Sequence, residues 1–185
     1  MATIGLNNLY MAPITGVDTP EEAYGTPEQL AKAISVKLSI NTETATLYAD
    51  DAAAEVETSF VDGDIEIDAD NLTPEMEAKL LGQKQDTDKV LYDDESDIAS
   101  YVALGFQAKM PKGNYKYTWL YRVKFARVEE EYNTKGEKIE FSTPKLVGKI
   151  VPRPDGKWRS RYVGKPADPT AKNWFKVVRE EAVIL

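Results

Sequence analysis

The stretch "YKYTWLYRVKF", residues 115–125, constrains the fold more than any other part of the chain. Large apolar residues fill its odd positions from Tyr115 to Phe125, and mostly polar residues fill the even ones. Such a period of two predicts a β-strand with one buried face. The connection "PKGN" is rich in turn formers, so residues 100–110 and this strand are expected to pair as a hairpin. We expect the aromatic face, Tyr115 through Phe125, to be a buried sheet face rather than a platform for nucleic-acid bases.

Other segments extend the sheet. Residues 32–40 and 64–70 also alternate, with Ile34, Val36, Leu38, Ile40, Ile65, Ile67 and Ala69 on their apolar faces. Residues 145–151 are expected to form a further strand, and residues 126–132 and 138–141 a hairpin across "NTKGE".

One helix is strongly indicated at "TPEMEAKLLG", with Thr73 as N-cap, Pro74 in the first turn and Gly82 as the stop. A second short helix is expected to begin near Asp168. The predicted fold is therefore mainly β, a β-sandwich or barrel with one flanking α-helix. It forms a single domain over residues 1–185, in which the role of residues 152–185 stays open.

The chain contains no cysteine and no histidine. Without them there is no disulfide framework, no thiolate metal site and no histidine base or nucleophile pair. No run approaches the ~20 apolar residues of a membrane span, so no membrane partner is expected. These absences weigh against an enzyme, and no cofactor is predicted.

Acidic residues crowd into residues 48–71. Asp64, Glu66, Asp68 and Asp70 recur at every second position, which predicts a solvent-facing stripe on a strand. The glycine of "DGDIEIDADNLT" stands second, so the segment does not match a calcium loop. An extended loop is predicted to carry Asp50, Asp51, Glu55 and Glu57, with a magnesium site there as the less favoured reading.

Charge is divided unevenly along the chain. Residues 1–100 carry 22 Asp/Glu and 5 Lys, a net charge of −17, whereas residues 101–185 carry 9 Asp/Glu and 18 Lys/Arg, a net charge of +9. The basic residues include Lys145, Lys149, Arg153, Lys157, Arg159, Arg161 and Lys165, interspersed with Trp158 and Tyr162. A protein with a pI of about 4.8 makes a poor general DNA binder. The two halves are more simply expected to attract each other, within one molecule or between stacked copies.

The order of these segments resembles the major tail protein family of long-tailed bacteriophages, the subunits of the tail tube. The resemblance is carried by "GLNNLYMAPIT", then by "ISVKLSINTETATLYADDAAAEVETSFVDGDIEIDADNLTPEMEAKLLG", and finally by "YVALGFQAKMPKGNYKYTWLYRVKFARVEEEYNTKGEKIEFSTPKLVGKI". It covers residues 5–150, and residues 152–185 match less distinctly.

The resemblance implies a structural virion protein, made in the host cytoplasm, that stacks as hexameric rings into a tube through which DNA leaves the capsid without specific binding. Its implied partners are further copies of itself and the tape measure, tail terminator and distal tail proteins. On this reading Asp64, Glu66, Asp68 and Asp70 face the lumen, and the segment with Asp50, Asp51, Glu55 and Glu57 is a long inter-subunit loop within about residues 40–64. Lys145, Lys149, Arg153, Arg159 and Arg161 are assigned to the contact between rings.

Several alternatives remain open from the sequence. A carbohydrate- or calcium-binding β-sandwich module would also be acidic and aromatic, and a carboxylate-dependent metal nuclease is a more distant possibility. The acidic stripe of Asp64, Glu66, Asp68 and Asp70 could, as an alternative to the lumen, face the tube exterior or meet basic residues of the next ring.

Overall fold

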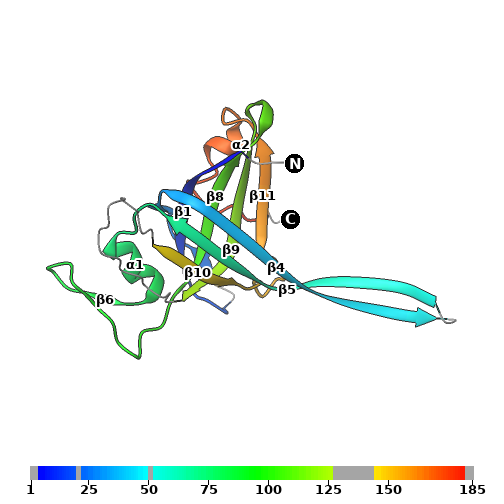
Figure 1. The fold of residues 1–185 in the computed structure, drawn as a ribbon, viewed down its shortest axis with the longest axis horizontal. Coiled ribbons are helices and arrows are strands. Elements are labelled where there is room, and N and C mark those ends of the chain that lie inside the picture. Colours follow the sequence, from blue (N-terminus) through cyan, green and yellow to red (C-terminus); the bar gives the residue numbers. More distant parts are fainter. Residues whose placement is uncertain (1–3, 20–21, 50–51, 127–143, 182–185) are drawn as a thin grey trace, which may run out of the picture.

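A computed structural model describes residues 4–19, 22–49, 52–126 and 144–181 of the chain. Within them the protein is mainly β, with a nine-stranded antiparallel sheet, a two-stranded sheet and two α-helices (Figure 1). The strands are β1 Gly5–Thr15, β2 Ala23–Tyr24, β3 Glu28–Ala31, β4 Ala33–Ala49, β5 Ala52–Ala69, β6 Lys84–Gln85, β7 Leu91–Tyr92, β8 Tyr101–Lys109, β9 Tyr115–Ala126, β10 Lys145–Ile150 and β11 Arg159–Gly164. The helices are α1 Pro74–Leu81 and α2 Pro169–Lys172, and a 3-10 turn spans Pro111–Gly113.

The large sheet follows the hydrogen-bonded order β2-β1-β8-β9-β10-β5-β4, with β3 added to β1 and β11 added to β9. The predicted hairpin over "PKGN" is confirmed as β8–β9, which closes at the pair Lys109 and Tyr115. The predicted strand at residues 145–151 is confirmed as β10, between β9 and β5. The hairpin predicted across "NTKGE" lies outside the described residues.

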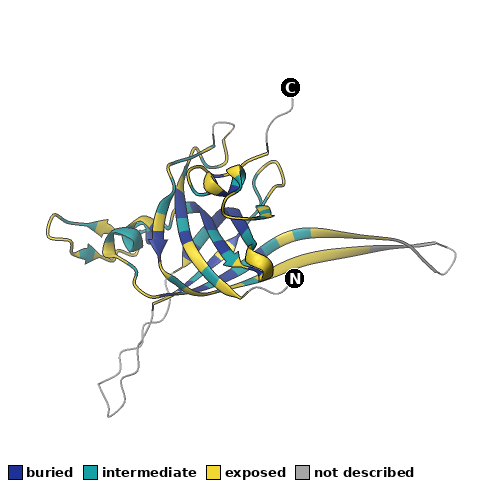
Figure 2. Ribbon diagram, turned by 90° about the horizontal axis from the view of Figure 1, so that it is seen from above, coloured by how far each residue is buried: buried dark blue, intermediate teal, exposed yellow. Residues whose placement is uncertain are grey.

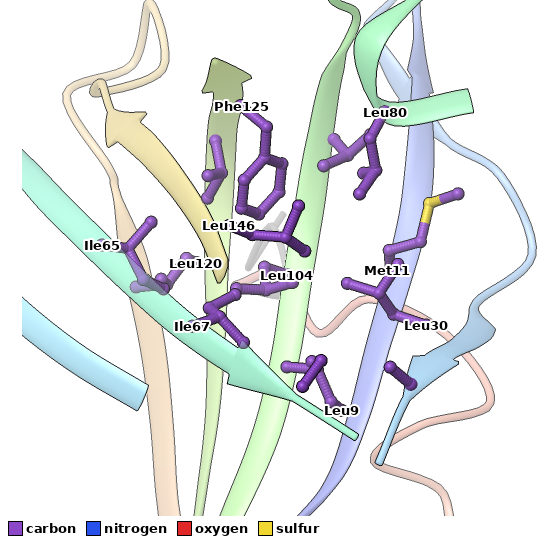
Figure 3. Close-up of a cluster of buried hydrophobic side chains, with 14 of the residues drawn as sticks. Leu9, Met11, Leu30, Ile65, Ile67, Leu80, Leu104, Leu120, Phe125 and Leu146 are labelled. Atoms are coloured by element: carbon purple, nitrogen blue, oxygen red, sulfur yellow. The ribbon is translucent and has the colours of Figure 1, made fainter. Parts of the chain in front are cut away.

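The first hydrophobic core lies inside the curl of the sheet. Side chains from β1, β3, β5, β8, β9, β10 and α1 converge there (Figure 3). Helix α1 closes this core with Leu80 and Leu81, and its predicted ends are confirmed. Thr73 Oγ1 accepts a hydrogen bond from the Met76 amide, and Gly82 ends the helix at φ 74°, a left-handed conformation that glycine adopts without strain.

A second core lies on the opposite face of the sheet, where Tyr117, Trp119 and Tyr121 of β9 pack against the C-terminal segment. Trp119 Nε1 donates to the Trp174 carbonyl oxygen at 2.9 Å, and the Tyr121 hydroxyl donates to the Arg179 carbonyl oxygen at 2.8 Å. The buried aromatic face is therefore confirmed for these three residues. Part of the segment after residue 152, including α2 at its predicted start after Asp168, covers this face.

A bulge in β9 changes the faces of its last residues. Leu104 pairs with Leu120 and Val102 pairs with Val123, so β9 has one more residue than β8 over this interval. Val123 and Phe125 consequently join Leu120 in the first core. The prediction of one continuous face from Tyr115 to Phe125 is wrong beyond Tyr121.

A similar irregularity occurs at the start of β4. The pairs Ala33 with Ala69 and Ser35 with Asp68 leave Ile34 as an extra residue, and it is 55% exposed. The prediction that Ile34 belongs to the apolar face is therefore wrong, because the bulge shifts the alternation by one position.

Candidate assembly surfaces

The outer part of the β4–β5 hairpin, residues 41–60, projects away from the body of the molecule, and we call it the arm (Figure 1). Apart from Phe60 at its base, the arm's described side chains are exposed, including Val56 at 60% (Figure 2). The predicted extended loop is wrong here, since the two strands continue to the pair Ala49 and Ala52. Glu57 and the backbone of Glu55 lie in β5, whereas Asp50 and Asp51 lie outside the described residues.

Local chemistry explains why this segment forms strands. Thr42, Thr44 and Thr46 occupy alternate positions in the outer part of β4, and such β-branched residues favour extended backbone. Thr44 Oγ1 and Thr58 Oγ1 lie 3.2 Å apart across the two strands, within hydrogen-bonding distance. The described side chains on both faces of the arm above its base are exposed to solvent, and the apolar alternation that identifies a half-buried strand is weak in its sequence.

The arm has surfaces and backbone groups that could bind another chain. A two-stranded hairpin without a third strand or a covering layer is only marginally stable in water. No strand among the described residues pairs with the outer edge of β4, so its backbone groups are available to another chain. The arm is therefore the part of the described molecule that is best suited to contact a partner.

The base of the arm is anchored to the body by stacked rings. Phe60 stacks on Trp158 with ring centroids 4.3 Å apart and nearly parallel planes, and the Arg159 guanidinium lies 4.1 Å from the Trp158 ring centroid. A further bulge between Asn41 and Thr42 marks the point where the strands leave the body. This anchoring sets the direction in which the arm projects.

The acidic stripe lies beside basic residues on the outer face of β4, β5 and β10. Asp64 pairs with Lys149 at 2.8 Å, and Glu66 lies between Lys37 at 3.3 Å and Lys145 at 3.7 Å. Asp68 accepts a hydrogen bond from the Ser35 hydroxyl at 2.5 Å. Asp70 follows the end of β5. We call Asp62, Asp64, Glu66 and Asp68, together with Lys37, Lys145 and Lys149, the charge ladder.

The charge ladder is nearly balanced rather than purely acidic. The hydrogen bond from Lys149 to Asp64 lowers the pKa of the Asp64 carboxyl and raises the pKa of the Lys149 ammonium group. The sequence reasoning assigned the stripe and the two lysines to different surfaces. The antiparallel pairing of β10 with β5 places them side by side, with Lys145 opposite Asp68 and Lys149 opposite Asp64.

The other predicted basic residues lie elsewhere. The side chain of Arg153 is mostly buried, donates to Glu180 and lies against the rings of Tyr24 and Tyr121. Arg159 and Arg161 lie on β11. The five residues assigned to the ring contact thus occupy three separate places in one subunit.

Sequence reasoning missed a buried ion cluster. Arg122, which alternation placed among solvent-facing residues, is 4% exposed at the β9 bulge. It donates to Glu22 and, at 2.8 Å, to Asp18, and these bonds raise the pKa of its guanidinium. Because both acids lie between β1 and β2, the cluster ties that connection to the centre of the sheet.

Removing Arg122 is expected to destabilise the fold. The Glu22 carboxylate, itself buried, would lose its main partner, at a cost of about 3 kcal/mol. Breaking a buried ion pair usually costs about 3–5 kcal/mol, and we expect the lower end here because Arg153 Nε remains 4.0 Å from Glu22. Urea unfolding of Arg122→Ala measures the loss, and the double variant Arg122→Met with Glu22→Gln should recover most of it. A loss below 1 kcal/mol for Arg122→Ala would show that the buried pair is not a stabilising element.

An open hollow of about 450 Å³ lies on the side of the second core. Tyr10 stacks on Phe175 at 4.8 Å within its wall, beside Tyr115, Tyr117 and the mostly buried amide of Gln107. Aromatic rings with nearby amide and hydroxyl groups are suited to a sugar ring or another flat polar molecule.

No group of three or more Asp or Glu side chains among the described residues has the arrangement needed to hold a metal ion. No helix in the described ranges has the length and apolar character needed to cross a membrane. In comparisons with known proteins, no family model matches the chain and no curated protein is significantly similar to it.

Proposed function

We propose that this protein is a structural subunit that polymerises through its arm, as stacked hexameric rings, into the tail tube of a bacteriophage. The observation that carries the proposal is the arm itself, a long two-stranded extension whose described side chains are exposed above its base and whose outer edge on β4 pairs with no described strand. The nine residues of β4 that belong to the arm, 41–49, span on the order of 30 Å at ~3.3 Å per residue, enough to reach a neighbouring copy. The resemblance of residues 5–150 to major tail proteins supports the same assignment.

Electrostatics also suit a DNA conduit. A tube must pass a polyanion without holding it, and each Lys or Arg contact to phosphate would add affinity through counterion release. In the charge ladder the lysines are engaged by carboxylates, which leaves little free positive charge for DNA. The charge ladder is therefore our candidate for the lumen lining, and DNA passes it without specific binding.

Negative-stain electron microscopy of the purified full chain tests the proposal. At high protein concentration we expect rings with sixfold symmetry, and stacks of them. Sedimentation velocity over the same concentrations should show growth from monomer to large species. A monomer at every concentration, without rings on the grid, would contradict the proposed function.

A sugar-binding module is the second candidate, and the aromatic hollow is the observation that favours it. Such a module would remain monomeric, and its melting temperature would rise with added saccharide. Tyr10→Ala and Phe175→Ala would abolish that rise. The oligomeric state and the saccharide response together separate this candidate from the first.

A further inference from the structure

Three cations gather on one face of the sheet at its β9–β11 end. Strand β11 pairs with β9 so that Arg161 is opposite Thr118 and Val163 is opposite Lys116, which places these residues on the same side. Arg159 precedes Arg161 by two residues on β11 and therefore lies on the same side. The reverse side is covered by the second core, whereas Arg161 is exposed and Val163 is 49% exposed. We call Lys116, Arg159 and Arg161 the basic face.

The basic face holds like charges together, and no carboxylate among the described residues pairs with them. None of its three residues forms an ion pair with any residue in the described ranges. Burial and the neighbouring Arg161 and Arg159 lower the pKa of the Lys116 ammonium group. Arg159 is held in place by stacking on Trp158. A group of cations that is held close together, and that no described carboxylate neutralises, suits a pair of carboxylates on a partner.

The arm carries two carboxylates of this kind. Glu43 pairs with Ser59, and Ala45 pairs with Glu57, so the two glutamates are diagonal neighbours on one face of the arm. Both are exposed, and neither forms an ion pair with a described residue. The arm and β11 extend in different directions from the body, so the arm points away from the basic face of its own subunit (Figure 1).

We propose that Glu43 and Glu57 on the arm of one copy dock on Lys116 and Arg161 of the next copy, whose Val163 adds an apolar contact. This inference rests on the proposed function and specifies the surface that receives the arm. Charge complementarity favours a second copy over nucleic acid as the occupant, since the whole chain carries a net charge of −8 and would repel DNA. In a tube the contact repeats in every subunit, so a modest pairwise attraction is multiplied.

Charge reversal on each side tests the docking. An arm variant carries Glu43→Lys and Glu57→Lys, and a face variant carries Lys116→Glu and Arg161→Glu. Each alone is expected to raise the protein concentration needed for assembly by roughly tenfold or more. Combining all four substitutions in one chain should restore assembly, because the opposite charges meet again. A matched control for the face variant, Lys172→Glu with Lys176→Glu, makes the same change in net charge as that variant and should assemble normally.

The outcomes separate this inference from the proposed function. Assembly by wild type and by both reversed variants would overturn the docking and leave the tube subunit intact, whereas failure of wild type to assemble would overturn both. A folded four-substitution chain that does not regain assembly also overturns the docking. If the face variant unfolds in urea more easily than wild type, Arg161→Glu alone is used, since Arg161 is exposed. Binding of short duplex DNA by wild type, lost in the face variant, would assign the basic face to nucleic acid instead.

Discussion

Shortening the arm is expected to abolish polymerisation while leaving a folded monomer. In the variant, residues 44–58 are replaced by Asn-Gly, so that Glu43 and Ser59, which already pair across the hairpin, are joined by a tight turn. The ring stack between Phe60 and Trp158 is kept, and the described side chains that are removed are exposed. The free energy of unfolding should therefore change by no more than about 1 kcal/mol.

Sedimentation velocity and electron microscopy compare this variant with wild type at equal concentration. The matched control keeps the full arm and replaces Thr44 and Thr58 with valine, which preserves the cross-strand pair as an apolar contact. That control should assemble. Normal tubes from the shortened chain would contradict the proposed role of the arm.

Neutralising the acidic stripe is expected to reverse the charge of the ladder. The variant carries Asp64→Asn, Glu66→Gln, Asp68→Asn and Asp70→Asn, which keep the shapes of the side chains and leave Lys37, Lys145 and Lys149 without these carboxylate partners. Because exposed ion pairs contribute only ~0–1 kcal/mol each, the fold should survive. If the charge ladder lines the lumen, tubes still form and now retain DNA, since free lysines add phosphate contacts.

Co-sedimentation with two DNA forms locates the charge ladder. Short linear duplexes can enter a tube, whereas a closed circular plasmid meets only its exterior. Retention of the short duplex alone indicates a lumen location, and retention of both indicates the exterior. Failure of tubes to form points to a contact between rings. Tubes that assemble and bind neither DNA form would contradict all three placements of the stripe.

The features that depend on neighbouring residues were predictable from the amino-acid sequence alone. Helix α1 begins at Thr73 and stops at Gly82 as predicted, because an N-cap hydroxyl and a left-handed glycine act within one turn of the chain. The β8–β9 hairpin was equally predictable, since a short turn joins two strands with clear alternation. The prediction of a buried aromatic face was confirmed as far as Tyr121, because it depends on alternation within a single strand.

Features that depend on pairing between distant segments became visible only in the folded molecule. The bulge that turns Val123 and Phe125 inward and buries Arg122 arises from the register between β8 and β9, which alternation along one strand does not encode. The charge ladder exists because β10 pairs with β5 across more than 75 residues of chain. The arm was expected to be a loop because strands that are wet on both faces carry no apolar period, and their backbone pairing becomes visible only in three dimensions.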